Sequence, residues 1–242
     1  MAGPFANALI TKLLVTNNLD DEDVSAILSL PIRSQRFDAH TLIVREGDRP
    51  EESCLIANGF AFRSKTTFDG QRQIVSLHIP GEIPDLQSLH LHVMDHDLAT
   101  LTPCFLGFIT HMDLRALNGA RPNVAAALWR ETLVDASIFR EWIVNVGRRP
   151  GTVRMAHLLS ELRYRLEAIG RTTDGAFELP ITQLELGDCL GLSAVHVNRV
   201  LKELRDEGLI QAERPSFRLL DKAGLEERGH FEPSYLHLSP SL

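Results

Sequence analysis

The spacing of apolar residues changes along the chain, and each change predicts a different kind of element. Residues 5–30 read as two short helices, with acidic residues at 20–23 in a first turn and Pro31 as a stop. From about 32 to 110, short β-rich runs are broken by Gly and Asp, which predicts strands of a small antiparallel roll or barrel. The runs are 41–45, 54–56, 60–65, 73–79, 98–101 and 105–110.

Residues 123–146 contain no Gly or Pro and are rich in apolar residues, which predicts one long helix. Further apolar residues, among them Leu133, Phe139 and Ile143, extend the apolar surface to a second side. A helix that is apolar on two sides needs two partners, and we expect these to be its own roll and the same helix of a second subunit. The alternative is a helix buried within a monomer. The stripe predicted to join two subunits consists of Val124, Leu128, Ile138 and Trp142.

Residues 182–204 carry the pattern of two short helices joined by a tight turn. Thr182 with Glu185 has the spacing of a capping box, Gly191 supplies the turn, and Ser193 caps the second helix. Two β-rich runs around Arg214-Pro215-Ser216 then predict a wing. We interpret the segment as a winged helix-turn-helix whose second helix enters the major groove of DNA, although a glycine turn alone also fits a structural helical hairpin.

Helical spacing turns four apolar residues of the second helix inward and leaves its polar residues outward. The predicted DNA-contacting residues are Thr182, Gln183, Ser193, Ala194, Val195, His196, Asn198, Arg199 and Lys202. Arg199 suits the O6 and N7 atoms of guanine, Asn198 suits adenine or a phosphate, and Val195 suits a thymine methyl group.

These elements together predict an α+β protein with three parts and a tail. Residues 1–121 are expected to form an antiparallel β-roll with N-terminal helices, and residues 122–148 are expected to form the dimerisation helix. Residues 149–225 form the winged helix-turn-helix, after a hinge at Arg148–Gly151, and 226–242 are a C-terminal tail.

Composition narrows the class of protein without contradicting this organisation. The net charge of −7 suits a DNA-binding protein only because the acidity lies mainly in the first part. Residues 1–146 hold 12 basic and 18 acidic residues, and 147–220 hold 11 and 10. The three cysteines form no CxxC pair, which argues against a disulfide framework or a cysteine-only metal site. No apolar run reaches membrane-span length and no signal-peptide pattern is present, so we expect a cytoplasmic protein without membrane contact.

The chain resembles the Crp/Fnr family of bacterial regulators, named after the cAMP receptor protein, over nearly its whole length. The landmarks occur in order: VREGD at 44–48, LIANGFAF at 55–62, FDGQRQIVSLHIPGE at 68–82, the long helix, and the helix-turn-helix. The resemblance implies a transcription regulator whose β-roll is cupin-like and similar to a cyclic nucleotide-binding domain. It also implies a homodimer on palindromic double-stranded DNA, with RNA polymerase as a further partner.

Two departures from the family pattern bear on the effector. Cyclic-nucleotide-binding members continue Pro-Gly-Glu with Gly-Glu-Leu and later carry an arginine for the cyclic phosphate, whereas this chain has residues 83–86 and Asp97 at those places. An acid in place of that arginine repels the anion, so we expect no tight cyclic AMP binding. No cysteine precedes Cys54, which leaves no N-terminal iron–sulfur cluster of the Fnr type. A small-molecule effector remains open, and its pocket is expected at Glu82, Ile83, Leu86, Asp97 and Leu98.

A histidine-rich segment supports a second hypothesis from another class. His90, His92 and His96 lie close in sequence, and cupin-like barrels hold metals, so a metal-binding cupin-like enzyme or sensor is the alternative function. However, the glycine and glutamate that accompany His-x-His in metal-binding cupins are absent here. We therefore predict no enzyme activity, no metal and no cofactor.

Overall fold

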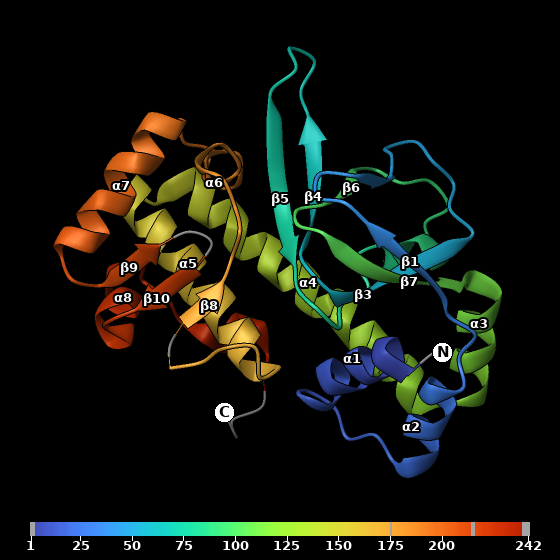
Figure 1. Ribbon diagram of the computed structural model, residues 1–242. Helices are drawn as coiled ribbons and strands as arrows, with labels where there is room; N and C mark the ends of the chain where they lie inside the picture. The colour runs from blue at the N-terminus through green and yellow to red at the C-terminus, as the bar shows by residue number, and fades with distance from the viewer. Residues whose placement is uncertain (1–2, 175, 214–215, 239–242) are drawn as a thin grey trace. The chain divides into compact units, whose positions relative to one another are not determined.

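A computed structural model describes residues 3–174, 176–213 and 216–238 (Figure 1). The chain forms two compact units. The first comprises Met1–Lys65 and Ser76–Asp135, and the second comprises Thr66–Val75 and Ala136–Leu242.

The first unit is built around two antiparallel sheets, of which only the last residue of β4 and the first part of β5 are grouped with the second unit. One sheet has the strand order β1-β7-β3 and the other β2-β6-β4-β5. Their strands are β1 (Arg33–Phe37), β2 (Leu42–Val44), β3 (Glu52–Asn58), β4 (Ala61–Thr66), β5 (Arg72–His78), β6 (Asp97–Thr100) and β7 (Cys104–Thr110). The short 3-10 helix η1 (Leu86–Leu89) lies between β5 and β6 in sequence. The six strands predicted from β-rich runs are thus present as β2 to β7.

Strand β1 was not predicted, and its burial pattern explains why. Four of its five side chains are exposed, so it lacks the alternation of apolar and polar residues that marks a strand. It is an edge strand that pairs only with β7, in a register that sets Arg33 opposite Phe108. Backbone pairing holds β1 in the sheet, and a sequence pattern does not reveal such pairing.

Alternation along β3 divides the core of the first unit into two clusters. Cys54 and Ile56 belong to the cluster between the sheets, whereas Leu55 and Ala57 face a second cluster made with helices. These helices are α1 (Gly3–Leu14), α2 (Asp21–Leu28), α3 (His111–Ala120) and the first turns of α4 (Pro122–Arg148). The acidic first turn predicted at 20–23 belongs to α2, where Asp20 and Asp23 form a capping box.

The second unit combines helices with a small sheet of order β8-β10-β9. Its remaining elements are α5 (Gly151–Ala168), β8 (Ala176–Glu178), α6 (Gln183–Leu190), α7 (Ala194–Asp206), β9 (Ile210–Glu213), β10 (Ser216–Leu219), α8 (Lys222–Arg228) and η2 (Pro233–Leu236). Strands β9 and β10 pair as the predicted wing, while Arg214 and Pro215 at its turn lie outside the described residues. The segment assigned to a tail, 226–242, contains the end of α8 and all of η2.

The predicted α+β architecture is confirmed: an antiparallel roll, a long helix and a C-terminal helix-turn-helix. Within the described residues, no helix has the length and apolarity needed to span a bilayer.

Candidate nucleic-acid interface

The turn between α6 and α7 is formed by local interactions that the sequence predicts. Thr182 caps α6: its hydroxyl accepts from the Glu185 N–H at 3.2 Å, and the Glu185 carboxylate accepts from the Thr182 N–H at 2.8 Å. Gly191 ends α6 in the left-handed conformation, with φ of 62°. Ser193 then caps α7 by accepting from the His196 N–H at 3.3 Å. Two capped helices therefore meet at a turn that favours glycine.

A second glycine is required for this turn and was missed in the sequence. A Cβ atom on Gly187 would lie 2.4 Å from the backbone oxygen of Leu192, which is a clash. Gly187 thus lets the turn fold back against α6. The sequence marks this role only by the position of Gly187 inside a helical pattern. Glycine in a helix interior lowers helix stability, so its presence there indicates a packing constraint.

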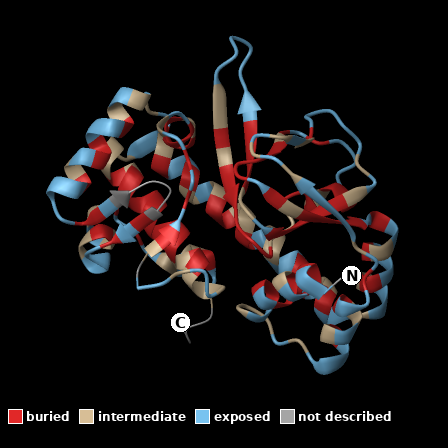
Figure 2. Ribbon diagram, viewed as in Figure 1, coloured by how far each residue is buried: buried red, intermediate tan, exposed pale blue. Residues whose placement is uncertain are grey.

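Helix α7 presents one polar face outward and one apolar face inward (Figure 2). Val197, Val200, Leu201 and Leu204 are buried. Of the predicted contact residues, Thr182, Ser193, Val195, Asn198, Arg199 and Lys202 are exposed, and Gln183, Ala194 and His196 are partly exposed. Because positions 195, 198, 199 and 202 follow helical spacing, they lie on one face of the helix. The predicted residues are thus brought together, and their contact with DNA stays a prediction.

His196 is in contact with the arginine predicted to read a base. The Arg199 Nη2 atom lies 3.0 Å from the His196 Nε2 atom, and since arginine only donates, the histidine nitrogen accepts. A Cβ atom on Gly151, at the start of α5, would lie 2.8 Å from the same Nε2 atom. The absence of a side chain at Gly151 therefore leaves room for this ring beside Arg199.

The stripe of α4 predicted to join two subunits is not available on its surface, which corrects that prediction. Val124, Leu128, Ile138 and Trp142 are each at most 7% exposed within a single chain. Val124 and Leu128 pack in the helical cluster of the first unit, and the Trp142 indole donates to Glu161 of α5. Periodicity showed a helix with two apolar sides, but it does not tell which side the rest of the chain covers.

A different stripe of α4 is exposed. Trp129, Leu133 and Ile143 are 64%, 52% and 71% exposed, with Arg140 exposed between them. Together with Ala126, Ala136 and Gly147, these positions repeat at alternating intervals of three and four residues, which is the pattern of a helix–helix seam. Leu133 and Ile143 are two of the residues that the sequence placed on the second apolar side.

The residues predicted for an effector pocket lie in several different surroundings. Leu86 is buried in the helical cluster, where Ile83 packs against it, and Leu98 is buried between the sheets. Glu82 accepts from the His78 ring at 3.0 Å, and Asp97 accepts from the Glu46 N–H at 2.8 Å. Their role in binding an effector stays a prediction.

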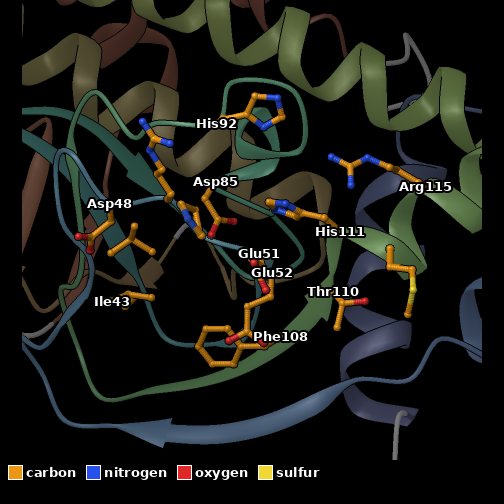
Figure 3. Close-up of a pocket in the computed structure, with 14 residues that line it drawn as sticks. Ile43, Asp48, Glu51, Glu52, Asp85, His92, Phe108, Thr110, His111 and Arg115 are labelled. Atoms are coloured by element: carbon orange, nitrogen blue, oxygen red, sulfur yellow. The ribbon is translucent and has the colours of Figure 1, made fainter.

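A cavity of about 1220 Å³ lies elsewhere in the first unit, and none of these five residues lines it (Figure 3). Asp85 lines it, and burial raises the pKa of this carboxyl group to about 7, although the Cys54 N–H donates to it at 2.8 Å. His111 also lines it and contacts the Ser88 hydroxyl at 3.0 Å, while burial and the neighbouring Arg115 lower the pKa of His111. Arg49 and His92 complete its basic part. The lining of the cavity therefore combines acidic and basic side chains.

A buried arginine of the roll lies beside residues 84–87, and its guanidinium is already hydrogen-bonded within the chain. Arg63 on β4 is 4% exposed. Its Nε atom donates to the Pro84 carbonyl at 2.6 Å and its Nη1 atom to Asp135 of α4 at 2.5 Å. Gln87 accepts a longer bond of 3.4 Å from the same guanidinium. This positive charge was not identified from the sequence, because its partners lie more than 20 residues away.

The histidine-rich segment does not converge on a metal site. His90 and His92 are exposed, whereas His96 is buried and bonded to Asp95 at 2.6 Å. Among residues 3–174, 176–213 and 216–238, no group of three histidine, cysteine or acidic side chains is arranged to hold a metal ion.

Comparisons with known proteins agree with this geometry. Residues 153–228 match the Crp-like helix-turn-helix domain, and residues 34–118 match the cyclic nucleotide-binding domain. The transcriptional activator protein FnrL of Cereibacter sphaeroides is 27% identical over 206 residues, covering 80% of this chain and 81% of its own. FnrA of Stutzerimonas stutzeri, also a transcriptional activator, is 25% identical, covering 89% of this chain and 88% of its own.

A solved structure shows the same fold. FixK2 from Bradyrhizobium japonicum has a TM-score of 0.74 at 23% identity, covering 82% of this chain and 97% of its own.

Proposed function

Because this chain belongs to the Crp/Fnr family of DNA-binding transcription regulators, we propose that it acts as a homodimer that places two copies of α7 in successive major grooves of a palindromic operator. The observation that carries the proposal is the outward face of α7, where Val195, Asn198, Arg199 and Lys202 are exposed above a buried apolar face. An α-helix of this kind fits the major groove, where base edges are distinguishable. Palindromy follows from the two-fold symmetry of a dimer.

Selection of bound sequences from random double-stranded DNA tests this proposal. We expect an inverted repeat whose half-site centres are separated by about 34 Å, one helical turn. Arg199→Ala should relax the preference at one base pair of each half-site. Arg171→Ala is the matched control, since Arg171 is an exposed arginine that lies outside α6, α7 and the strands of the wing. Recovery of no enriched sequence, or of single unpaired half-sites, would contradict the proposal.

The exposed stripe of α4 is the proposed contact between subunits. Trp129, Leu133 and Ile143 leave large apolar surfaces in water, and a second copy of the same seam removes that surface from water on both sides. Leu133→Glu should turn the dimer into a monomer in sedimentation experiments, whereas Leu184→Glu, at another exposed leucine, should leave it dimeric. A Leu133→Glu protein that stays dimeric would assign the contact to another surface.

For the roll, we propose that no cyclic nucleotide is required for DNA binding. The support is the Arg63 guanidinium, which is already bonded to Pro84 and to Asp135 beside the segment that follows Pro-Gly-Glu. Titration calorimetry with cyclic AMP should give no micromolar binding, and the affinity for the selected operator should not change when cyclic AMP is added. Tighter operator binding with cyclic AMP would refute this.

The remaining assignments follow from the same family. We propose that the protein acts in the cytoplasm, because its DNA partner lies there. We also propose that it has no catalytic activity and binds no metal or cofactor. Contact with RNA polymerase at promoters is proposed because the relatives compared above are called transcriptional activators. Transcription in vitro from a promoter that carries the selected operator tests this, since an activator should raise transcript yield with purified polymerase alone.

A further inference from the structure

The C-terminal segment after the wing packs closely against α5. Leu225 of α8 and Leu236 of η2 are both buried. The rings of Phe231 and Tyr235 lie 5.3 Å and 5.9 Å from the His157 ring, measured between centroids. Gly229 makes the approach possible, because a Cβ atom there would lie 2.6 Å from the backbone nitrogen of His157. This segment is therefore an integral part of the second unit.

A buried carboxylate joins this segment to two helices. Glu161 of α5 has no exposed surface. It accepts from the Tyr235 hydroxyl at 2.8 Å, from the Trp142 indole Nε1 at 3.1 Å, and from Arg165 at 3.1 Å. Burial raises the pKa of Glu161, and these three donors act against that rise. A buried carboxylate is costly unless it is paired and hydrogen-bonded, so each donor that is lost leaves a penalty.

The three donors to Glu161 come from different elements, so the hydrogen bonds hold these elements together. Trp142 lies on the last turns of α4, Arg165 lies on α5 itself, and Tyr235 lies on η2. The bridge of Trp142, Glu161 and Tyr235 therefore spans the connection between α4 and α5, where Pro150 precedes the first residue of α5. Backbone rotation at that connection would separate the Trp142 indole from Glu161.

The start of α5 is in turn tied to the helix-turn-helix. The Arg154 Nη1 atom donates to the Leu190 carbonyl at the end of α6 at 2.7 Å. The Thr152 hydroxyl donates to Glu203 of α7 at 3.0 Å. A change of the angle between the end of α4 and α5 therefore also changes the position of α7 relative to the end of α4.

We propose that Tyr235 is a positioning residue for DNA binding: its hydroxyl completes the bridge through Glu161 that holds the end of α4 against α5 and so sets where α7 is presented. This inference rests on the proposed function, because the position of α7 matters only if two copies must reach two half-sites. Tyr235 touches no DNA in this scheme, and it affects the strength of operator binding without affecting the bases that are preferred.

The test compares three variants of the full chain. Tyr235→Phe removes the bridging hydroxyl and keeps the ring beside His157. Tyr164→Phe removes the other tyrosine hydroxyl, which takes no part in the bridge. Phe231→Leu weakens packing on the same face of α5 but leaves the hydroxyl, so it controls for general loss of stability. Two quantities are measured for each: affinity for the operator selected with wild-type protein, and hydrogen exchange of the Trp142 indole N–H by nuclear magnetic resonance.

For Tyr235→Phe we expect operator affinity to fall on the order of tenfold, within the usual range of coupling between sites, with faster exchange of the Trp142 indole proton and an unchanged base preference. Tyr164→Phe and Phe231→Leu should keep wild-type affinity at a temperature where all variants are folded. The inference is overturned if Tyr235→Phe binds as tightly as wild type, if Trp142 exchange does not change, or if Phe231→Leu loses as much affinity. Failure of the wild-type protein to select any DNA would instead overturn the proposed function.

Discussion

The interior of the roll around Arg63 and the outer face of α7 hold their charged groups in opposite ways. Arg63 is 4% exposed and bonded to a carbonyl and a carboxylate, whereas Asn198, Arg199 and Lys202 are all exposed. An anion arriving at Arg63 must displace an ion pair that already exists. DNA arriving at α7 displaces mainly water. The difference indicates that the second unit is prepared for an external charged partner, while the roll satisfies its charge from within the chain.

Breaking the enclosed ion pair tests the first half of this comparison and should have the largest effect. Arg63→Met leaves Asp135 and the Pro84 carbonyl without their donor. Breaking a fully buried pair in this way costs about 3–5 kcal/mol, and the 26% exposure of the Asp135 side chain places this pair at the lower end of that range. We expect a loss of that order in the first unit, seen as faster native-state hydrogen exchange of the β4 and β7 amides. Arg63→Met combined with Asp135→Leu should recover much of the loss, because no unpaired charge remains. Equal destabilisation of the single and double variants would show that the pair itself matters little.

The pH dependence of the two units sharpens the comparison. Burial raises the pKa of Asp85 to about 7 in the first unit and lowers the pKa of His157 to about 4 in the second. Because the Asp85 carboxyl ionises first in the unfolded chain, its contribution lowers the free energy of unfolding as pH rises from about 4 to 7. The pH dependence from His157 runs in the opposite direction. Because the unfolded imidazole binds the proton first, its contribution lowers the free energy of unfolding as pH falls from about 6.5 to 4.

Asp85→Asn isolates the first of these effects. Asparagine resembles the protonated carboxyl and still accepts from the Cys54 N–H. We expect wild-type stability for the variant near pH 4 and a gain on the order of 2–4 kcal/mol at pH 8. Urea unfolding followed by exchange of the β3 amides measures it at both pH values. A gain of the same size at pH 4 and pH 8 would mean that Asp85 does not titrate in this range.

The two regions also differ in how far the sequence predicts them. Helix α7 was predicted with its caps and outward residues because every signal lies within four residues along the chain. Arg63 and Asp135 are 72 residues apart, and no local pattern marks them as partners. The bridge of Trp142, Glu161 and Tyr235 was missed for the same reason, with a separation of 74 residues between Glu161 and Tyr235.

The long helix α4 lies between these extremes. Its apolar pattern predicted a helix correctly, but the four residues of the stripe assigned to a second subunit are buried within the single chain. Burial by segments distant in sequence decides which face remains free, and periodicity does not contain that information. Strand β1 shows the converse case, where backbone pairing alone makes an element that side-chain pattern does not reveal.

Arg199→Ala tests the second half of the comparison, with an intermediate effect. Its guanidinium is exposed and its described partner is the His196 ring, so its removal should not destabilise the fold. We expect a loss of about 1–3 kcal/mol in discrimination at one base pair, with little change in binding to unrelated DNA. Competition binding with operators altered at single positions measures this. A uniform loss across all sequences would assign Arg199 to a phosphate instead.

The smallest expected effect on stability comes from removing one helix cap in each unit. Ser193 caps α7 and Thr110 caps α3, each accepting a backbone N–H three residues on, at 3.3 Å and 3.1 Å. Replacing either by alanine removes one such bond and should cost about 1 kcal/mol of stability in its own unit. Only Ser193→Ala should also weaken operator binding, because fraying of the first turn of α7 displaces Val195 and His196 from the face presented to DNA. Thermal unfolding and operator affinity of the two variants separate these effects. Equal affinities would show that the first turn of α7 is held by its packing alone, and would move the DNA contact toward Arg199 and Lys202.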